Sequence, residues 1–226
     1  MANQKRIATY RGTANQKRIA TYCGIAAALV SLGAILLATL VAPPETFTWQ
    51  GKALSDMGRY GAPTFPIFNG GLILSGLLGF PFIWLTWIMS RNALERLGVA
   101  LLALAVVGMI GVGVFFLDHT AVYLETSLHG VAALAVFGIA PFASWVYGTG
   151  AALAGDSRLA IASFWFGNVH PLAWLGWIFS VGGTATSSAW FAVPEFVVSV
   201  AFSGWIVSLA FTIRQRDDGE LDAPNR

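Results

Sequence analysis

The chain has 226 residues, of which 56% are hydrophobic and 11% are charged, and its mean hydropathy is +0.68. A soluble domain has about 25% charged residues, so a composition this apolar excludes a water-facing surface and predicts a protein that lives in a bilayer. The formal net charge of +2 does not indicate a nucleic-acid partner, and the single cysteine, Cys23, excludes an intrachain disulfide framework.

The N-terminal segment is basic and contains a tandem repeat. Residues 2–10 (ANQKRIATY) recur unchanged at residues 14–22. Identity over a single unit is typical of a recent duplication or an upstream start codon, and not of a solenoid. We expect residues 1–21 to form a basic segment beside anionic headgroups, followed by an uncleaved first helix.

Six apolar runs are each long enough to cross roughly 30 Å of hydrocarbon. A membrane barrel is excluded because its strands would be about ten residues long with alternating polarity. The sequence therefore predicts an all-α fold, a polytopic membrane bundle of six transmembrane helices within residues 22–213. The predicted helices are 22–41, 67–89, 97–117, 127–147, 159–181 and 191–213.

The first connection, residues 44–65, is too long for a simple turn. It interleaves aromatic and aliphatic side chains with Lys52, Asp56 and Arg59, and Ser55 can cap a short helix within it. Amphipathic segments of this kind lie in the headgroup layer. We therefore expect this connection to lie on the membrane as a lid.

Basic residues divide unequally between the two sides of the predicted bundle. The N-terminal segment, the second and fourth connections and the tail hold 11 of them, whereas the first connection holds the other 2, Lys52 and Arg59. Because lysine and arginine are retained in cytoplasmic loops, we expect both termini to be cytoplasmic and the protein to lie in the cell membrane. The acidic tail, residues 214–226, lacks apolar periodicity and is predicted to be disordered.

Ionisable side chains within a bilayer cost about 2.5–3.5 kcal/mol each, so their positions indicate candidate sites. Glu125 and His129, four residues apart in the predicted fourth helix, would share one face and could bind a metal ion or share a proton. The alternative is that they only complement the helix dipole. Asp118 and His119, at the end of the third helix, could converge on the same place or be solvated at the interface.

Two further polar groups lie deeper in the predicted bundle. Glu195 is followed by Ser199 and Ser203 at four-residue steps, a stripe that should face the bundle, where serines also serve helix packing. His170 precedes Pro171, which should bend the fifth helix. It should lie roughly 10 Å deeper than His129, so we expect the two not to share one site. This mismatch argues against haem held by two histidines.

These positions predict an outward-facing pocket beneath the first connection. Four acids and one histidine should converge there, namely Asp56, Asp118, Glu125, Glu195 and His129. The catalytic candidates are His129, Glu125 and Glu195, and a divalent metal could be held by His129, Glu125 and Asp118. Since no phosphate loop, nucleophile elbow or zincin helix is present, whether the protein is an enzyme stays open.

Several short motifs resemble an uncharacterised six-helix membrane family, mostly archaeal and actinobacterial, known as the domain of unknown function number nine hundred and ninety-eight. The likeness covers nearly the whole chain after Tyr22. More remotely, the turn between the third and fourth helices is similar to that of the eukaryotic DRAM-like six-helix proteins. The motifs are Leu54-Ser55-Asp56-Met57-Gly58, Asn69-Gly70, and Phe116 with Asp118 leading to Leu128-His129-Gly130.

The resemblance implies that five residues group on the outer face, namely Ser55, Asp56, Asn69, Asp118 and His129, and it names no reaction. Together with the positions of the ionisable groups described above, this gives six candidate binding residues, namely Ser55, Asp56, Asn69, Asp118, His119 and His170. The predicted function is to bind or process a lipid or small molecule, with a metal or a proton. One alternative is a non-catalytic membrane subunit or scaffold. The other is a small transporter, and the His170-Pro171 kink is the only feature of the sequence that supports it. Membrane lipids are the expected partners.

Overall fold

The computed structural model describes residues 14–181 and 189–221. Within these residues the chain forms six long α-helices and two short 3-10 helices, with no strand, which confirms the predicted all-α bundle. The elements are α2 (Ala14–Val41), η1 (Leu54–Gly58), α3 (Phe65–Ile88), α4 (Ala93–Val114), η2 (His119–Ala121), α5 (His129–Leu153), α6 (Ser157–Val181) and α7 (Ala192–Leu221).

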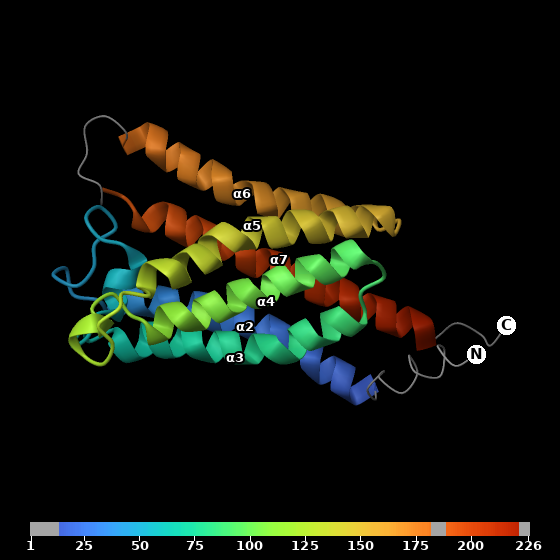
Figure 1. Cartoon of the computed structure of the whole chain (residues 1–226), viewed down its shortest axis with the longest axis horizontal. Helices are drawn as coiled ribbons and strands as arrows, with labels where there is room; N and C mark the ends of the chain where they lie inside the picture. The colour runs from blue at the N-terminus through green and yellow to red at the C-terminus, as the bar shows by residue number, and fades with distance from the viewer. Residues whose placement is uncertain (1–13, 182–188, 222–226) are drawn as a thin grey trace.

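The six long helices form a ring. Each packs against its neighbours in the chain, and α7 closes the ring by packing against α2 (Figure 1). The start of α2 and the end of α7 lie at one end of the bundle, which we call the terminal end. Residues 42–64, which include η1, and residues 115–128 lie at the opposite end, which we call the η1 end (Figure 1).

Five of the described helices are long and apolar enough to cross a membrane, namely α2, α3, α4, α5 and α7. The shortest, α4, has 22 residues and so spans about 33 Å. The 25-residue α6 includes Asn168 and His170 and does not meet the same criterion of composition. Because Trp165 and Phe179 are exposed on it, α6 has an apolar outer face, and a sixth crossing stays a prediction.

Residues 115–128 are a folded connection, and the predicted ends of the two flanking helices need correction. α4 ends at Val114 and not at Leu117, while α5 begins at His129 and not at Ser127. The backbone leaves the helical conformation at Phe115, where φ is −93° and ψ is 61°. Buried histidines bind the carbonyl groups of Phe115 and Phe116, and η2 adds a short turn of 3-10 hydrogen bonds, so the connection is held by both side chains and backbone.

Both ends of the predicted membrane domain are extended by helix. α7 continues to Leu221, although disorder was expected from Arg214, because Arg216 is held by acidic side chains of other elements. α2 begins at Ala14, so the second copy of the repeat is helical. The first copy, residues 2–10, and the end of the tail, residues 222–226, lie outside the described residues.

The larger of two hydrophobic core clusters among the described residues fills the half of the bundle nearer the terminal end, and the smaller one packs around η1. The fully buried members of the larger cluster include Tyr147, Trp205 and Leu209, and the indole of Trp205 donates to the Ser163 hydroxyl (3.0 Å). Small residues allow close helix contacts there. A Cβ atom added at Gly98 would lie 2.7 Å from the backbone nitrogen of Tyr147, so α4 and α5 touch through their backbones.

Candidate functional site

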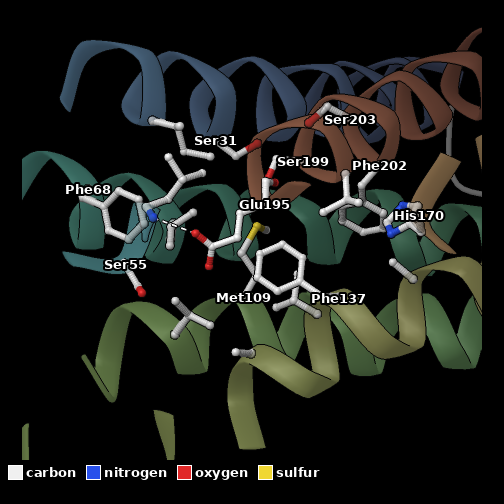
Figure 2. Close-up of a pocket in the computed structure, with 18 of the residues that line it drawn as sticks. Ser31, Ser55, Phe68, Met109, Phe137, His170, Glu195, Ser199, Phe202 and Ser203 are labelled. Atoms are coloured by element: carbon white, nitrogen blue, oxygen red, sulfur yellow. Dashed lines mark hydrogen bonds between the residues drawn. The ribbon is translucent and has the colours of Figure 1, made fainter. Parts of the chain in front are cut away.

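An internal cavity of about 60 Å³ lies in the half of the bundle nearer the η1 end (Figure 2). Its wall takes residues from η1 and from all six long helices, because the helices form a ring around it. A water molecule needs about 10–15 Å³ of such volume, so the cavity has room for about four waters. The polar residues of its wall are Ser31, Ser55, His129, His170, Glu195, Ser199 and Ser203.

Glu195, in the first turn of α7, directs its carboxylate into this cavity (Figure 2). The side chain is only 6% exposed. One oxygen, Oε2, accepts a hydrogen bond from the Leu54 backbone N–H at 2.6 Å. The structure gives the other oxygen no hydrogen bond with any described residue. Glu195 therefore ties α7 to η1 and also presents an uncommitted oxygen to the cavity.

His170, immediately before Pro171 in α6, lines the cavity at the end far from Ser55 (Figure 2). It is 2% exposed, and within the described part of the chain neither ring nitrogen has a hydrogen-bond partner of normal geometry. The Phe137 backbone lies close to the ring without forming such a bond. An unpaired buried polar group costs about 1–3 kcal/mol, so this imidazole is suited to a water or a ligand.

The prediction that His170 and His129 differ too much in depth to share one site needs correction. Both line one cavity, because the cavity extends along the helices from η1 toward the middle of the bundle. The serines of the α7 stripe, Ser199 and Ser203, line it as well. The Ser199 hydroxyl donates to the Glu195 carbonyl (2.7 Å), whereas Ser203 has no hydrogen bond to a described residue.

η1 covers the cavity at the η1 end and is held by three hydrogen bonds, two with α3 and its N-cap residue and one with α7. Thr64 donates its hydroxyl proton to the Met57 carbonyl (2.7 Å), and the Asn69 side-chain amide donates to the Gly58 carbonyl (2.8 Å). Glu195 accepts from Leu54, as described above. The predicted binding residue Asn69 therefore serves to hold the covering segment and does not line the cavity.

Asp56 and Asp118, two of the predicted pocket acids, bind backbone and side chains of the connections and are not part of the cavity wall. Asp56 accepts from Arg59 Nε (2.7 Å) and from the Ala53 N–H (2.9 Å). Asp118 accepts from the Tyr60 N–H (3.0 Å). The two carboxylates thus stabilise the covering segment and its contact with residues 115–128.

The prediction that Glu125 and His129 share a helical face is wrong. α5 begins at His129, so Glu125 precedes the helix and is exposed. His129 Nδ1 donates to the Phe115 carbonyl (2.7 Å), and His119 Nδ1 donates to the Phe116 carbonyl (2.6 Å). The two histidines thus bind carbonyl groups of the two residues that follow α4, and the Phe116 carbonyl also accepts from the His119 backbone N–H (3.0 Å).

The predicted metal ligands do not come together. Glu125 lies on the surface, Asp118 binds Tyr60, and His129 uses Nδ1 for a carbonyl group. Within residues 14–181 and 189–221, no group of three histidine, cysteine or acidic side chains could hold a metal ion. Of the five residues predicted to converge, Glu195 and His129 line the cavity, and we propose no metal site.

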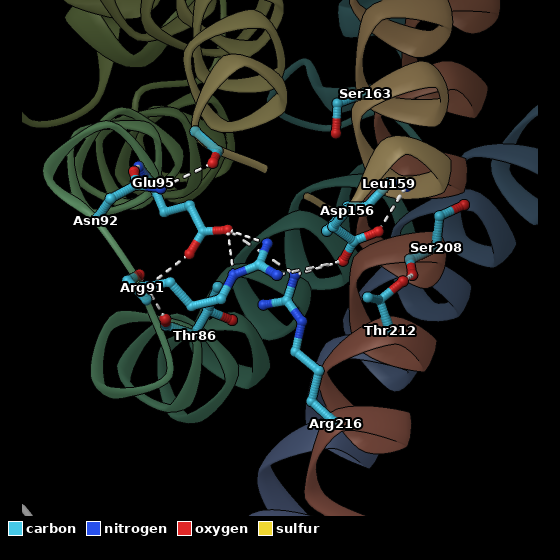
Figure 3. A network of polar contacts seen from close by, with 12 residues as sticks. Thr86, Arg91, Asn92, Glu95, Asp156, Leu159, Ser163, Ser208, Thr212 and Arg216 are labelled. Carbon is cyan, nitrogen blue, oxygen red and sulfur yellow. Dashed lines mark hydrogen bonds and ion pairs between the residues drawn. The ribbon is translucent and has the colours of Figure 1, made fainter. Parts of the chain in front are cut away.

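A second polar cluster, which the sequence argument missed, lies near the terminal end (Figure 3). Glu95 is 0% exposed and accepts from Arg91 Nε (3.0 Å), while Arg216 donates to Asp156 (2.8 Å) and lies 3.8 Å from Glu95. Two local signals could have indicated it. Arg91 and Glu95 are four residues apart, and Asn92 caps α4 by accepting from the Glu95 N–H (3.0 Å).

Asp156, between α5 and α6, makes stability depend on pH. Burial raises the pKa of its carboxyl. Hydrogen bonds from Arg216 and from the Leu159 N–H lower this pKa by more than burial raises it, so the pKa lies below its ordinary value of 3.8. Its contribution to the free energy of unfolding is therefore complete above pH of about 4 and is lost as the pH falls through the folded-state pKa.

Asp156→Asn should lower the thermal unfolding midpoint at neutral pH and reduce the further loss of stability below pH of about 4. Asparagine can still cap α6, so only the charge is removed. Thermal unfolding in detergent at a series of pH values measures both effects. Glu45→Gln, at an exposed position, is the control; an unchanged acid profile in Asp156→Asn would contradict the prediction.

A ring of apolar helices around a small internal cavity is the architecture of a helical membrane protein. The chain belongs to the family described as protein of unknown function (DUF998), whose model matches residues 19–212, and this confirms the resemblance seen in the motifs. No curated protein and no solved structure matches the chain.

Proposed function

We propose that this protein binds a small, largely apolar molecule inside its helix bundle, in the cavity beneath η1. The observation that carries the proposal is the His170 imidazole, which is buried, unpaired and part of the cavity wall. Small-molecule sites are typically apolar with a few polar groups that orient the ligand. Phe68, Phe137 and Phe202 supply the apolar wall here, while His170 and Glu195 supply polar groups at separate positions (Figure 2).

The packing of the bundle favours binding over transport. A transported molecule would have to pass the terminal half, where Tyr147, Trp205 and Leu209 are fully buried and the cluster around Glu95 joins α4 to α7. The described basic residues outside the first connection, among them Lys17 and Arg91, lie toward the terminal end. This arrangement supports a cytoplasmic terminal end, with the ligand arriving from outside the cell at the η1 end.

The cavity volume limits the ligand to a molecule of about five heavy atoms, similar to about four waters. 1-Butanol is therefore a suitable probe. We expect it to raise the thermal unfolding midpoint of the detergent-solubilised protein, because a ligand that binds only the folded state stabilises it. Ala133→Phe, which fills the cavity, should abolish this effect.

Ala100→Phe adds the same side chain at an exposed position on α4 and is the matched control. It should keep the response to 1-butanol, and any effect of the alcohol on the micelle should appear equally in both variants. Equal responses in Ala133→Phe and Ala100→Phe would show that the alcohol does not bind in the cavity, which would contradict the proposed function.

A further inference from the structure

We infer that the ligand is a short-chain primary amine, bound as its ammonium ion with Glu195 as the counter-charge. This inference rests on the proposed function and adds the chemical class of the ligand. Its basis is the presence of one buried carboxylate in a cavity whose described wall has no lysine or arginine.

The described cavity wall has no lysine or arginine that could balance the charge of the Glu195 carboxylate. Oε2 accepts one backbone hydrogen bond, from Leu54, and the other oxygen faces the cavity. An isolated carboxylate is strongly disfavoured in an apolar interior, whereas a carboxylate paired with a cation through a hydrogen bond is tolerated. A cationic group of the ligand would supply this missing partner.

The rest of the wall suits an ammonium ion with a short hydrocarbon chain. Phe68, Phe137 and Phe202 line the cavity, and aromatic rings attract cations to their faces while also accepting apolar chains. An ammonium group has three donors. The free oxygen of Glu195 and the Ser55 hydroxyl, which has no hydrogen bond to a described residue, are acceptors toward the η1 end of the cavity, whereas Ser203 lies about two helical turns farther along α7 (Figure 2).

The same features disfavour other ions. An anion would meet the Glu195 carboxylate with no lysine or arginine of the described wall to offset the repulsion. Calcium takes six to eight oxygen ligands. The described residues offer no group of three metal-binding side chains. A single carboxylate with aromatic neighbours therefore fits a monovalent organic cation.

Three probes of nearly equal size and different charge test the inference. We expect n-butylammonium at neutral pH to raise the thermal unfolding midpoint of the wild-type protein more than 1-butanol does, and butyrate to have no effect. Glu195→Gln keeps an acceptor for Leu54 but removes the charge. It should weaken the affinity for n-butylammonium by about tenfold or more and leave that for 1-butanol nearly unchanged.

The controls separate the two proposals. Ala133→Phe should abolish the effects of both n-butylammonium and 1-butanol, and Glu45→Gln, at an exposed acid, should leave both intact. Equal stabilisation by n-butylammonium and 1-butanol would overturn the amine inference and leave the proposed binding function standing. Absence of stabilisation by either probe would overturn both. The three-probe comparison on the wild-type protein decides the inference even if Glu195→Gln does not fold.

Discussion

Glu95→Ala is expected to lower the free energy of unfolding by about 3–5 kcal/mol, the cost of removing one partner from a buried ion pair. The Glu95 side chain is 0% exposed and binds both the Arg91 guanidinium and the Arg91 backbone N–H, the latter at 2.6 Å. Without it, Arg216, whose side chain is 17% exposed, keeps Asp156 as its remaining ion-pair partner. Arg91 is 31% exposed, so solvent already screens its charge and it adds less to the cost.

Unfolding of the purified protein in mixed detergent micelles measures this loss. Glu45→Ala is the matched control, because it removes an exposed glutamate and should change the free energy of unfolding by less than about 0.5 kcal/mol. Glu95→Gln keeps the shape of the side chain and should show a large part of the loss. If Glu95→Ala were as stable as Glu45→Ala, the cluster at the terminal end would not hold the bundle together.

Gly98→Ala is expected to lower the free energy of unfolding by about 1–3 kcal/mol through overpacking between α4 and α5. The added Cβ would lie 2.7 Å from the backbone nitrogen and 2.8 Å from the Cα atom of Tyr147. These are backbone atoms, so no side-chain rotation relieves the clash, and the two helices must move apart. The separation would also disturb Glu95, whose backbone nitrogen would lie 2.6 Å from a Cβ added at Gly150.

Gly130→Ala is the control for this substitution, because a Cβ added at Gly130 has no atom within 4 Å. Alanine has the higher helix propensity, so this variant should be unchanged or more stable by up to about 1 kcal/mol. Both variants are compared by unfolding in the same micelles. If Gly98→Ala and Gly130→Ala had similar free energies of unfolding, α4 and α5 would be farther apart at Gly98 than in the structure described here.

The candidate site could be predicted from the sequence only in part. Glu195 stood out because a carboxylate within an apolar run is costly, and it does line the cavity. The predicted pairing of Glu125 with His129 was wrong. A four-residue spacing implies a shared face only if both residues lie in one helix, and α5 begins at His129. The spacing could not show that His119 and His129 bind the carbonyl groups of Phe116 and Phe115, the residues that follow α4.

The sequence by itself determined the class of the protein, the number of long helices and the family, because runs of about twenty apolar residues and short motifs are local properties of the chain. Which polar groups meet was decided by the tertiary structure alone. Closing six helices into a ring brings Glu195 to Leu54 and Arg216 to Glu95, pairs far apart in the chain. Such contacts depend on the residue at which each helix begins and on the rotation of the helix about its axis. An apolar run without a strong polar face specifies neither the starting residue nor the rotation.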